Sequence, residues 1–405
     1  MSSALPLSGV RVLDFTWVGA GPIGTKILAE FGAEVIKVES RSRPDPLRRT
    51  GPFAPGTDPL ERSGYFADRN PQKSSISLDL THPRARDVVL RLATVSDVCA
   101  QSFRPGTMEK WRLGYEELTE VRPDLIYLAM PMQGESGPHS TFSGFGATLV
   151  ALCGLHELCG YPDREPVGTG TNYPDHVPNP LHAVFAVLGA LRHRALTGQG
   201  QRIELSQLES TINVIGPAIE AAALGHAPIR DGNRIAHAVP HGVFPAAGDD
   251  RWVAIAVMDD RQWRGLAGAT GLDSFAADRW STFEGRLASR DTIESQLADW
   301  TSALEPDEIE ARLVRSGVPV SVVRNAGELL EGASGLRARG AFETLPHPVM
   351  GDTIYTATTP RLSRTPGRLD TPAPLLGQQT DTVLQDLLGM SISDIASLRD
   401  DGVLA

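Results

Sequence analysis

The stretch from residue 10 to residue 39 decides the fold: VRVLDF (10–15), a turn containing GAGPIG (19–24), and AEVIKVE (33–39). VRVLDF is a short apolar run directly after a glycine, which predicts a buried strand, and AEVIKVE predicts a second one. Residues 25–31, between the two runs, have the spacing of a helix. A strand, a glycine-containing turn, a helix and another strand predict a βαβ unit, whose two strands lie parallel in one sheet.

The same alternation continues to about residue 130. Short apolar runs predict further strands at 75–80, 97–100 and 124–129, and a helical pattern covers 84–93. Repeated β-α-β units place helices on both faces of a parallel sheet. We therefore predict an α/β protein whose large domain is built on a Rossmann-like parallel sheet.

The later part of the chain is organised differently. Two long helical patterns, at 181–196 and 206–224, are followed by a turn-rich change in composition. Strands are expected at 252–257 and 318–323, among short helical patterns, which together predict a smaller α/β domain.

A Pro-rich segment at about 346–376 predicts an extended strap that crosses back, and the last helix is expected near 379–389. The predicted domain boundaries follow from these patterns: 1–224 for the first part of the large domain, 225–330 for the small domain, and 331–405 for the return strap and the C-terminal part of the large domain.

The composition is that of an ordinary globular protein, with 405 residues and a net charge of −11. Such an acidic chain is a poor general binder of nucleic acid or anionic membranes, so neither partner is expected. The three cysteines form no CxxC pair, which argues against a disulfide framework or a zinc ribbon. We read neither a secretion signal nor an apolar run of the roughly twenty residues that span a bilayer, and predict a cytoplasmic protein.

The turn at residues 19–24 fits the pattern GxGxxG, and Glu39 ends the following strand. Together they form the formal fingerprint of a dinucleotide site. Pro22 lacks one of the N–H groups that would face a pyrophosphate, and Trp17 is bulky for the entrance of such a turn. Three interpretations stay open: an NAD site, a turn that lines another nucleotide ligand, and a turn that needs glycines for packing alone.

A basic stretch follows the second predicted strand and comprises Lys37, Arg41, Arg43, Arg48 and Arg49. In an acidic protein, this concentration favours binding of phosphate or carboxylate groups, and a solvated loop is the alternative. Further along the chain, Lys73 and Arg104 add isolated positive charges near predicted strand ends.

Asp175 lies in TNYPDHVPNP (171–180), just before the apolar helix predicted at 181–196. A carboxylate near a helix N-terminus is stabilised as an anion by the helix dipole and can act as a nucleophile. The alternative is an aspartate that only caps the helix. The histidines nearby show no spacing typical of metal ligands, and there is no GxSxG motif, so neither a metal site nor a serine hydrolase is predicted.

Ordered blocks over some 370 residues resemble the family III CoA-transferases, a group that includes formyl-CoA transferase, carnitine CoA-transferase and the α-methylacyl-CoA racemases. The blocks that carry the resemblance are LSGVRVLDF (7–15), GP (21–22), LAEFGAEVIKVE (28–39), NPQKSSISLDL (70–80), SFRPG (102–106) with LGY (113–115), TGQGQ (197–201) with ELSQ (204–207), GVP (317–319) and LGQ (376–378).

The resemblance implies that Asp175 is the catalytic nucleophile. It also implies contacts to CoA from eight residues: Val18, Gly19, Ala20, Arg41, Lys73, Phe103, Arg104 and Lys110. Ser102 replaces an asparagine that is usual in the family. The implied architecture is a homodimer of protomers interlocked like rings, with a heterodimer as the alternative.

The implied activity is transfer of CoA from an acyl-CoA thioester to a free carboxylic acid, through an aspartyl anhydride and an aspartyl-CoA thioester on Asp175. A carboxylate is required because each covalent intermediate must remain activated. CoA thioesters would be substrates, and no permanently bound cofactor or metal is expected.

Two alternatives within the resemblance are an α-methylacyl-CoA racemase or acyl-CoA isomerase, and a subunit of a hetero-oligomeric transferase such as an arenesuccinate type. The racemases carry a histidine where this sequence has SGFG (143–146), which favours transfer. The glycine run of formyl-CoA transferase is absent from residues 233–244, where His237 and His241 are candidate contacts to the acyl substrate.

Overall fold

The computed structural model describes residues 4–226, 228–332 and 335–404. Contacts within the chain divide it into two compact units. Unit 1 comprises Met1–His156, Gly168–Ala227 and Ala338–Ala405, and unit 2 comprises Glu157–Val167 and Pro228–Arg337. The domain boundaries at residues 224 and 330 stay predictions.

Unit 1 is built on a six-stranded sheet in which every neighbouring pair of strands is parallel. The spatial order is β3 (Lys73–Ser77), β2 (Glu34–Glu39), β1 (Arg11–Phe15), β4 (Val98–Gln101), β5 (Ile126–Ala129) and β6 (Gln201–Glu204). The order reverses between β1 and β4, where a crevice opens at the carboxyl ends of the strands in such folds. The predicted Rossmann-like parallel sheet is confirmed.

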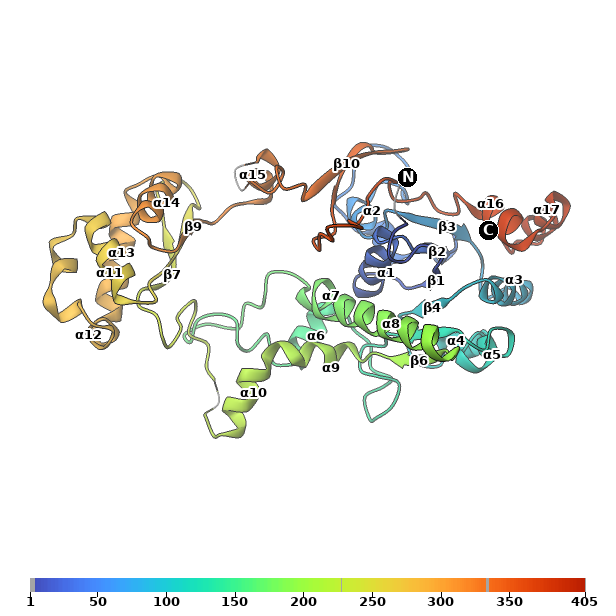
Figure 1. The fold of residues 1–405 in the computed structure, drawn as a ribbon, viewed down its shortest axis with the longest axis horizontal. Coiled ribbons are helices and arrows are strands. Elements are labelled where there is room, and N and C mark those ends of the chain that lie inside the picture. Colours follow the sequence, from blue (N-terminus) through green and yellow to red (C-terminus); the bar gives the residue numbers. More distant parts are fainter. Residues whose placement is uncertain (1–3, 227, 333–334, 405) are drawn as a thin grey trace. The chain divides into compact units, whose positions relative to one another are not determined.

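Helices cover both faces of this sheet. On one face, α1 (Ala20–Glu30) and α8 (Pro178–Thr197) pack on apolar side chains of the central strands. The other face is covered by α3 (Pro83–Thr94), α5 (Tyr115–Val121), α16 (Thr380–Leu388) and α17 (Ile392–Asp400). The C-terminal helices α16 and α17, red in Figure 1, thus return beside the blue N-terminal elements β3 and α3.

Several elements of unit 1 differ from the prediction. The helix expected at 206–224 is divided into α9 (Gln207–Ile212), the 3-10 turn η2 (Asn213–Ile215) and α10 (Gly216–Ala223), because Pro217 cannot donate a helical N–H bond. The Pro-rich strap begins with a hairpin, β10 (Phe342–His347) and β11 (Gly351–Thr356), instead of being extended throughout. β6 and α17 were not predicted at all.

Short elements complete unit 1: η1 (Pro46–Arg49), α2 (Gly64–Arg69), α4 (Thr107–Lys110), α6 (Gly146–Leu152) and α7 (Tyr173–His176). The long helix α8 follows α7 almost directly, and ends at Gly198, whose φ of 75° is the left-handed conformation typical of a helix C-terminus. The predicted apolar helix at 181–196 is therefore confirmed, with an earlier start.

Unit 2 contains an antiparallel sheet of β7 (His241–Pro245), β8 (Trp252–Ala256) and β9 (Val320–Val322). Its helices are α11 (Asp260–Thr270), α12 (Phe283–Ala288), α13 (Arg290–Ser302), α14 (Pro306–Arg315) and α15 (Ala326–Glu331), with short turns η3 (Asp273–Ala276) and η4 (Asp278–Trp280). A core of Trp263, Phe275 and Trp280 with aliphatic side chains holds the unit together. Among the described residues of either unit, no helix combines the length and apolarity that crossing a membrane requires.

Candidate active site

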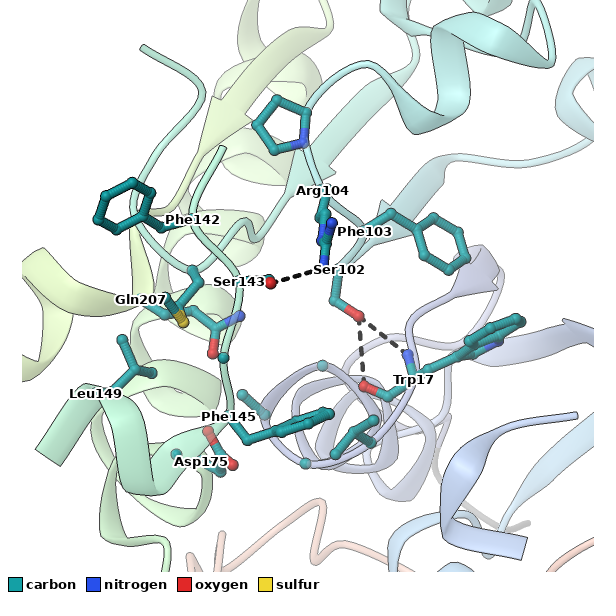
Figure 2. A pocket seen from close by; sticks show the side chains of 18 residues that line it. Trp17, Ser102, Phe103, Arg104, Phe142, Ser143, Phe145, Leu149, Asp175 and Gln207 are labelled. Atoms are coloured by element: carbon teal, nitrogen blue, oxygen red, sulfur yellow. Dashed lines mark hydrogen bonds between the residues drawn. The ribbon is translucent and has the colours of Figure 1, made fainter. Parts of the chain in front are cut away.

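A pocket of about 370 Å³ opens in unit 1 at the carboxyl ends of β1, β4 and β5, where the strand order reverses. This volume is within the range of small-molecule sites. Its walls come from the β1–α1 turn (17–21), the segment after β4 (102–105), Met132 after β5, the segment before and within α6 (142–149), and Asp175 and Gln207 (Figure 2). The sequence predicted parts of this lining: the glycine turn as a candidate ligand site, and Phe103, Arg104 and Asp175 as single candidate residues.

Asp175 lies in the short helix α7 and is only 5% exposed. It does not cap α8, whose N-cap residue is Val177, so the interpretation of Asp175 as a cap of that helix is wrong. The backbone N–H of Gly146 donates to the Asp175 carboxylate. The side chain therefore borders the pocket as a buried carboxylate with few polar neighbours.

Two glycines make room for this carboxylate. A Cβ on Gly19 would lie 2.7 Å from the Asp175 Cβ, and a Cβ on Gly146 would lie 2.7 Å from Asp175 Oδ2. Both distances are shorter than any contact that carbon atoms tolerate, so a side chain at either position would displace Asp175. Gly21 serves packing instead, because its Cβ would lie 2.4 Å from the Cβ of Thr16.

Burial raises the pKa of Asp175 to about 6, against the weaker opposing effects of the Gly146 N–H and the Arg69 guanidinium. The sequence predicted an anion held by the helix dipole, but the loss of water contact outweighs that stabilisation. At neutral pH the carboxylate is still mainly ionised, and a carboxylate with a raised pKa is a stronger base and nucleophile than an exposed aspartate.

Replacement of Asp175 by asparagine is expected to stabilise the protein above pH 6. The pKa of Asp175 is higher in the folded than in the unfolded chain, so ionisation of this carboxyl lowers the free energy of unfolding. This loss of stability begins near pH 4 and is nearly complete above about pH 6. The gain should reach about 3 kcal/mol, because folding raises the pKa of this carboxyl from 3.8 to about 6. Thermal unfolding of both proteins between pH 4 and pH 8 measures it; equal stability of the two at pH 8 would contradict the burial cost.

Five of the eight predicted CoA contacts line the same pocket as Asp175: Val18, Gly19, Ala20, Phe103 and Arg104. Ser102 lines it too, and its hydroxyl accepts from the backbone N–H of Trp17 at 3.0 Å. The exposed Arg104 donates to the Ser143 hydroxyl at 2.6 Å, which joins two walls of the pocket. In Figure 2, Arg104 lies at the end of the pocket opposite Asp175.

The other three predicted contacts lie outside the residues that line the pocket. Arg41 and Lys110 are exposed. Lys73 is buried, and its ammonium donates to Asp14 (3.2 Å), Thr25 (2.7 Å) and Asn70 (2.9 Å). Their roles as contacts to CoA stay predictions.

The basic stretch after β2 is divided by the fold. Lys37 and Arg48 are fully buried, and each pairs with a carboxylate, which neither sequence interpretation had foreseen. Arg48 holds both oxygens of Glu39, at 2.9 Å and 2.7 Å. Because both oxygens already bind Arg48, Glu39 cannot accept a hydrogen bond from a ribose, as the acidic residue of an NAD site does. This argues against the interpretation of the glycine turn as an NAD site.

Sequence reasoning gave no site role to several residues that line the pocket, among them Gly146, Leu149 and Gln207. The only available signal was the glycine pattern in SGFG (143–146). His237 and His241 belong to unit 2, where His237 is exposed and the His241 ring contacts the carbonyl of Asn233. Their contact with an acyl group stays a prediction.

A buried carboxylate, Asp175, and an exposed arginine, Arg104, therefore line one pocket at the switch point of the parallel sheet. The model of CoA-transferase family III matches residues 7–380. The chain belongs to this family, and is a CoA-transferase of family III.

Similar proteins cover nearly the whole chain. The succinyl-CoA–L-malate CoA-transferase alpha subunit of Chloroflexus aurantiacus is 34% identical and covers 99% of this chain and 93% of its own length. The succinyl-CoA–D-citramalate CoA-transferase of the same species is also 34% identical, and the match covers 98% of each chain. The crystal structure of a CAIB/BAIF family protein from Brucella suis has a TM-score of 0.87 and 28% identity, covering 95% of this chain and 100% of that one.

Proposed function

We propose that this enzyme moves CoA from an acyl-CoA thioester to a free carboxylic acid through covalent intermediates on Asp175. The observation that carries the proposal is the position of Asp175, a buried carboxylate in the pocket at the strand switch point, against two glycines that leave space beside it. Among the described residues that line this pocket, it is the only carboxylate.

The chemistry balances in four steps without proton transfer. The Asp175 carboxylate attacks the donor thioester, and CoA leaves as a thiolate from a mixed anhydride. The thiolate then attacks the aspartyl carbonyl, which releases the donor acid and leaves an aspartyl-CoA thioester. The acceptor carboxylate attacks this thioester, forming a second anhydride and freeing the thiolate. The thiolate takes the new acyl group and restores the Asp175 carboxylate.

CoA would lie along the pocket wall formed by Val18, Gly19, Ala20 and Phe103, with Arg104 near its phosphates. An arginine suits a phosphate because its planar guanidinium offers several donors. Arg41, Lys73 and Lys110 are the further contacts that the family resemblance implies. CoA thioesters are substrates in this proposal, and no resident cofactor takes part.

The first donor to test is succinyl-CoA, with malate and citramalate as acceptors, since these acids appear in the names of the two relatives from Chloroflexus aurantiacus.

A racemase needs two acid/base groups on opposite sides of the substrate α-carbon. Of the described residues that line the pocket, only Asp175 has a proton to exchange near neutral pH, and Phe145 stands in the segment where the racemases carry a histidine. The pocket lining therefore favours transfer.

Trapping of the intermediate tests the proposal. The protein is incubated with succinyl-CoA and quenched with hydroxylamine or borohydride, and the modified peptide is mapped by mass spectrometry. Modification at Asp175, absent from the Asp175→Asn variant, supports transfer. Deuterium from solvent at the acyl α-carbon without modification of Asp175 would support the racemase instead.

The rate of transfer is expected to depend on the ionisation of Asp175. Its pKa is raised to about 6, so kcat/KM should be constant at higher pH and fall about ten-fold for each pH unit below about 6. An exposed aspartate would keep its activity down to about pH 4. The 3′-phosphate of CoA also titrates near pH 6, so a dephospho-CoA thioester is the control. An acid limb that disappears with that substrate would contradict the assignment to Asp175.

We further propose that the enzyme is a homodimer of interlocked protomers. Large apolar side chains on α8 are exposed in the single chain, with Leu181 at 52% and Phe185 at 77%. Such a patch is typical of a surface that another chain covers. A heterodimer is the alternative, since one relative is named an alpha subunit. Light scattering of the purified chain measures its molar mass in solution. A molar mass of one chain would contradict the homodimer.

A further inference from the structure

The turn between β1 and α1, which forms one wall of the pocket, is fixed from three directions. Three consecutive backbone N–H groups each donate to a side chain from a different segment: Thr16 to Asp14 Oδ1 (2.8 Å), Trp17 to Ser102 Oγ (3.0 Å) and Val18 to Asp45 Oδ1 (3.1 Å). Since side chains satisfy all three groups, the conformation of the turn depends on residues outside it.

Val18 adopts an unfavourable backbone conformation in this turn. Its φ is 69°, in the left-handed region that β-branched residues almost never occupy. Such a conformation persists only where surrounding contacts impose it. The contact that reaches the Val18 peptide directly is the hydrogen bond from its N–H to Asp45.

Asp45 is itself held rigidly by a buried ion pair. Its other oxygen accepts from Lys37 Nζ at 2.9 Å, and both side chains are fully buried. Lys37 Nζ also donates to the carbonyl of Thr16 at 2.8 Å, while the N–H of Leu47 donates to Asp45 Oδ1 at 3.0 Å. The Lys37–Asp45 pair therefore holds the turn at two points, the carbonyl of Thr16 and the N–H of Val18.

The residue after Val18 is Gly19, which lies against Asp175 so closely that a Cβ there would be 2.7 Å from the Asp175 Cβ. Rotation of the Val18 peptide would move Gly19, and with it the space in which the Asp175 carboxylate lies. A displacement of about 1 Å at a reacting group is enough to reduce a rate by up to about a hundred-fold.

We propose that Asp45 is a positioning residue of the transfer reaction: paired with Lys37, it holds Val18 in the left-handed conformation and so keeps Gly19 in place against Asp175. Asp45 is not among the residues that line the pocket and acts through the turn. The inference rests on the proposed role of Asp175 in catalysis.

A double-mutant cycle tests the proposal. Asp45→Ala should lower kcat by about ten-fold or more, because the Val18 peptide relaxes toward a negative φ. Glycine occupies the left-handed region without cost, so in a Val18→Gly background the same Asp45→Ala change should lower kcat by only about three-fold or less. An equal loss of kcat in both backgrounds would overturn the proposal.

A crystal structure of Asp45→Ala supplies a measurement independent of activity. A negative φ at Val18 is the expected result, and an unchanged φ of about 69° would overturn the inference. If the parent protein transfers no CoA, the proposed function fails, and this structure then decides only whether Asp45 holds Val18 in the left-handed conformation. Glu61→Gln is the matched control: it removes a buried charge paired with Arg48 at 2.6 Å, without touching the turn. It should lower stability and leave kcat within about two-fold of the parent.

Discussion

Replacement of Asp175 by asparagine is expected to lower kcat for CoA transfer by about four orders of magnitude or more. An amide has nearly the same shape as the carboxylate and can still accept from the Gly146 N–H. It cannot form an anhydride with the donor acyl group, so the first covalent step is lost. Steady-state rates with succinyl-CoA and each acceptor acid measure the effect.

Misfolding would not explain such a loss, because the same variant is expected to be more stable than the parent above pH 6. Asp163→Asn is a useful control, since it makes the same chemical change at an exposed side chain in unit 2. It should leave the rate unchanged. An Asp175→Asn variant that retains activity within about ten-fold of the parent would rule out covalent catalysis by this residue.

The central βαβ unit was predictable because its apolar runs are short and bounded by glycines, and because both strands are buried over most of their length. β6 was not, since its sequence QRIE (201–204) is mostly polar and alternates between half-buried and exposed positions at the edge of the sheet. Edge strands carry weak sequence patterns, because one side lacks a neighbour.

The helix α17 was missed although its N-terminus carries a recognisable signal. Ser391 accepts from the N–H of Asp394, whose carboxylate accepts from the N–H of Ser391, which forms a capping box. The prediction placed the last helix at 379–389 and ended there. The capping box in the sequence thus marks the start of this helix.

The environment of Asp175 could not be derived from local sequence. Its neighbours in the chain suggest a helix cap. Its burial, which raises its pKa, instead depends on packing against Gly19 and Gly146, which are distant in sequence. The same holds for Lys37, whose charge suggested a ligand contact. Its partner Asp45 and its burial depend on how β2 and the following segment fold back on the β1–α1 turn. Tertiary contacts, not residue types, separate a binding cation from a structural one.

Alanine substitutions at two glycines of the motif at residues 19–24 are expected to have different effects on the rate. Gly19→Ala is expected to lower kcat by about a hundred-fold, because the added Cβ would lie 2.7 Å from the Asp175 Cβ and 2.9 Å from its Oδ2. The Asp175 Cβ is bonded to the backbone of α7 and cannot rotate away, so either the turn or α7 must move. The φ of Gly19 is −94°, outside the left-handed region that favours glycine, so the expected effect comes from the close contact with Asp175.

Gly24→Ala is the control from the same motif. Its Cβ would come no closer than 3.6 Å, to the carbonyl oxygen of Pro180, which is an ordinary contact. Because Gly24 lies within α1, alanine should stabilise the helix by up to about 1 kcal/mol and leave the rate unchanged. Rates and thermal unfolding of both variants separate the two roles. If both lose activity equally, the glycines serve the turn as a whole. If only Gly19→Ala does, the role of Gly19 is to leave space for the Asp175 carboxylate.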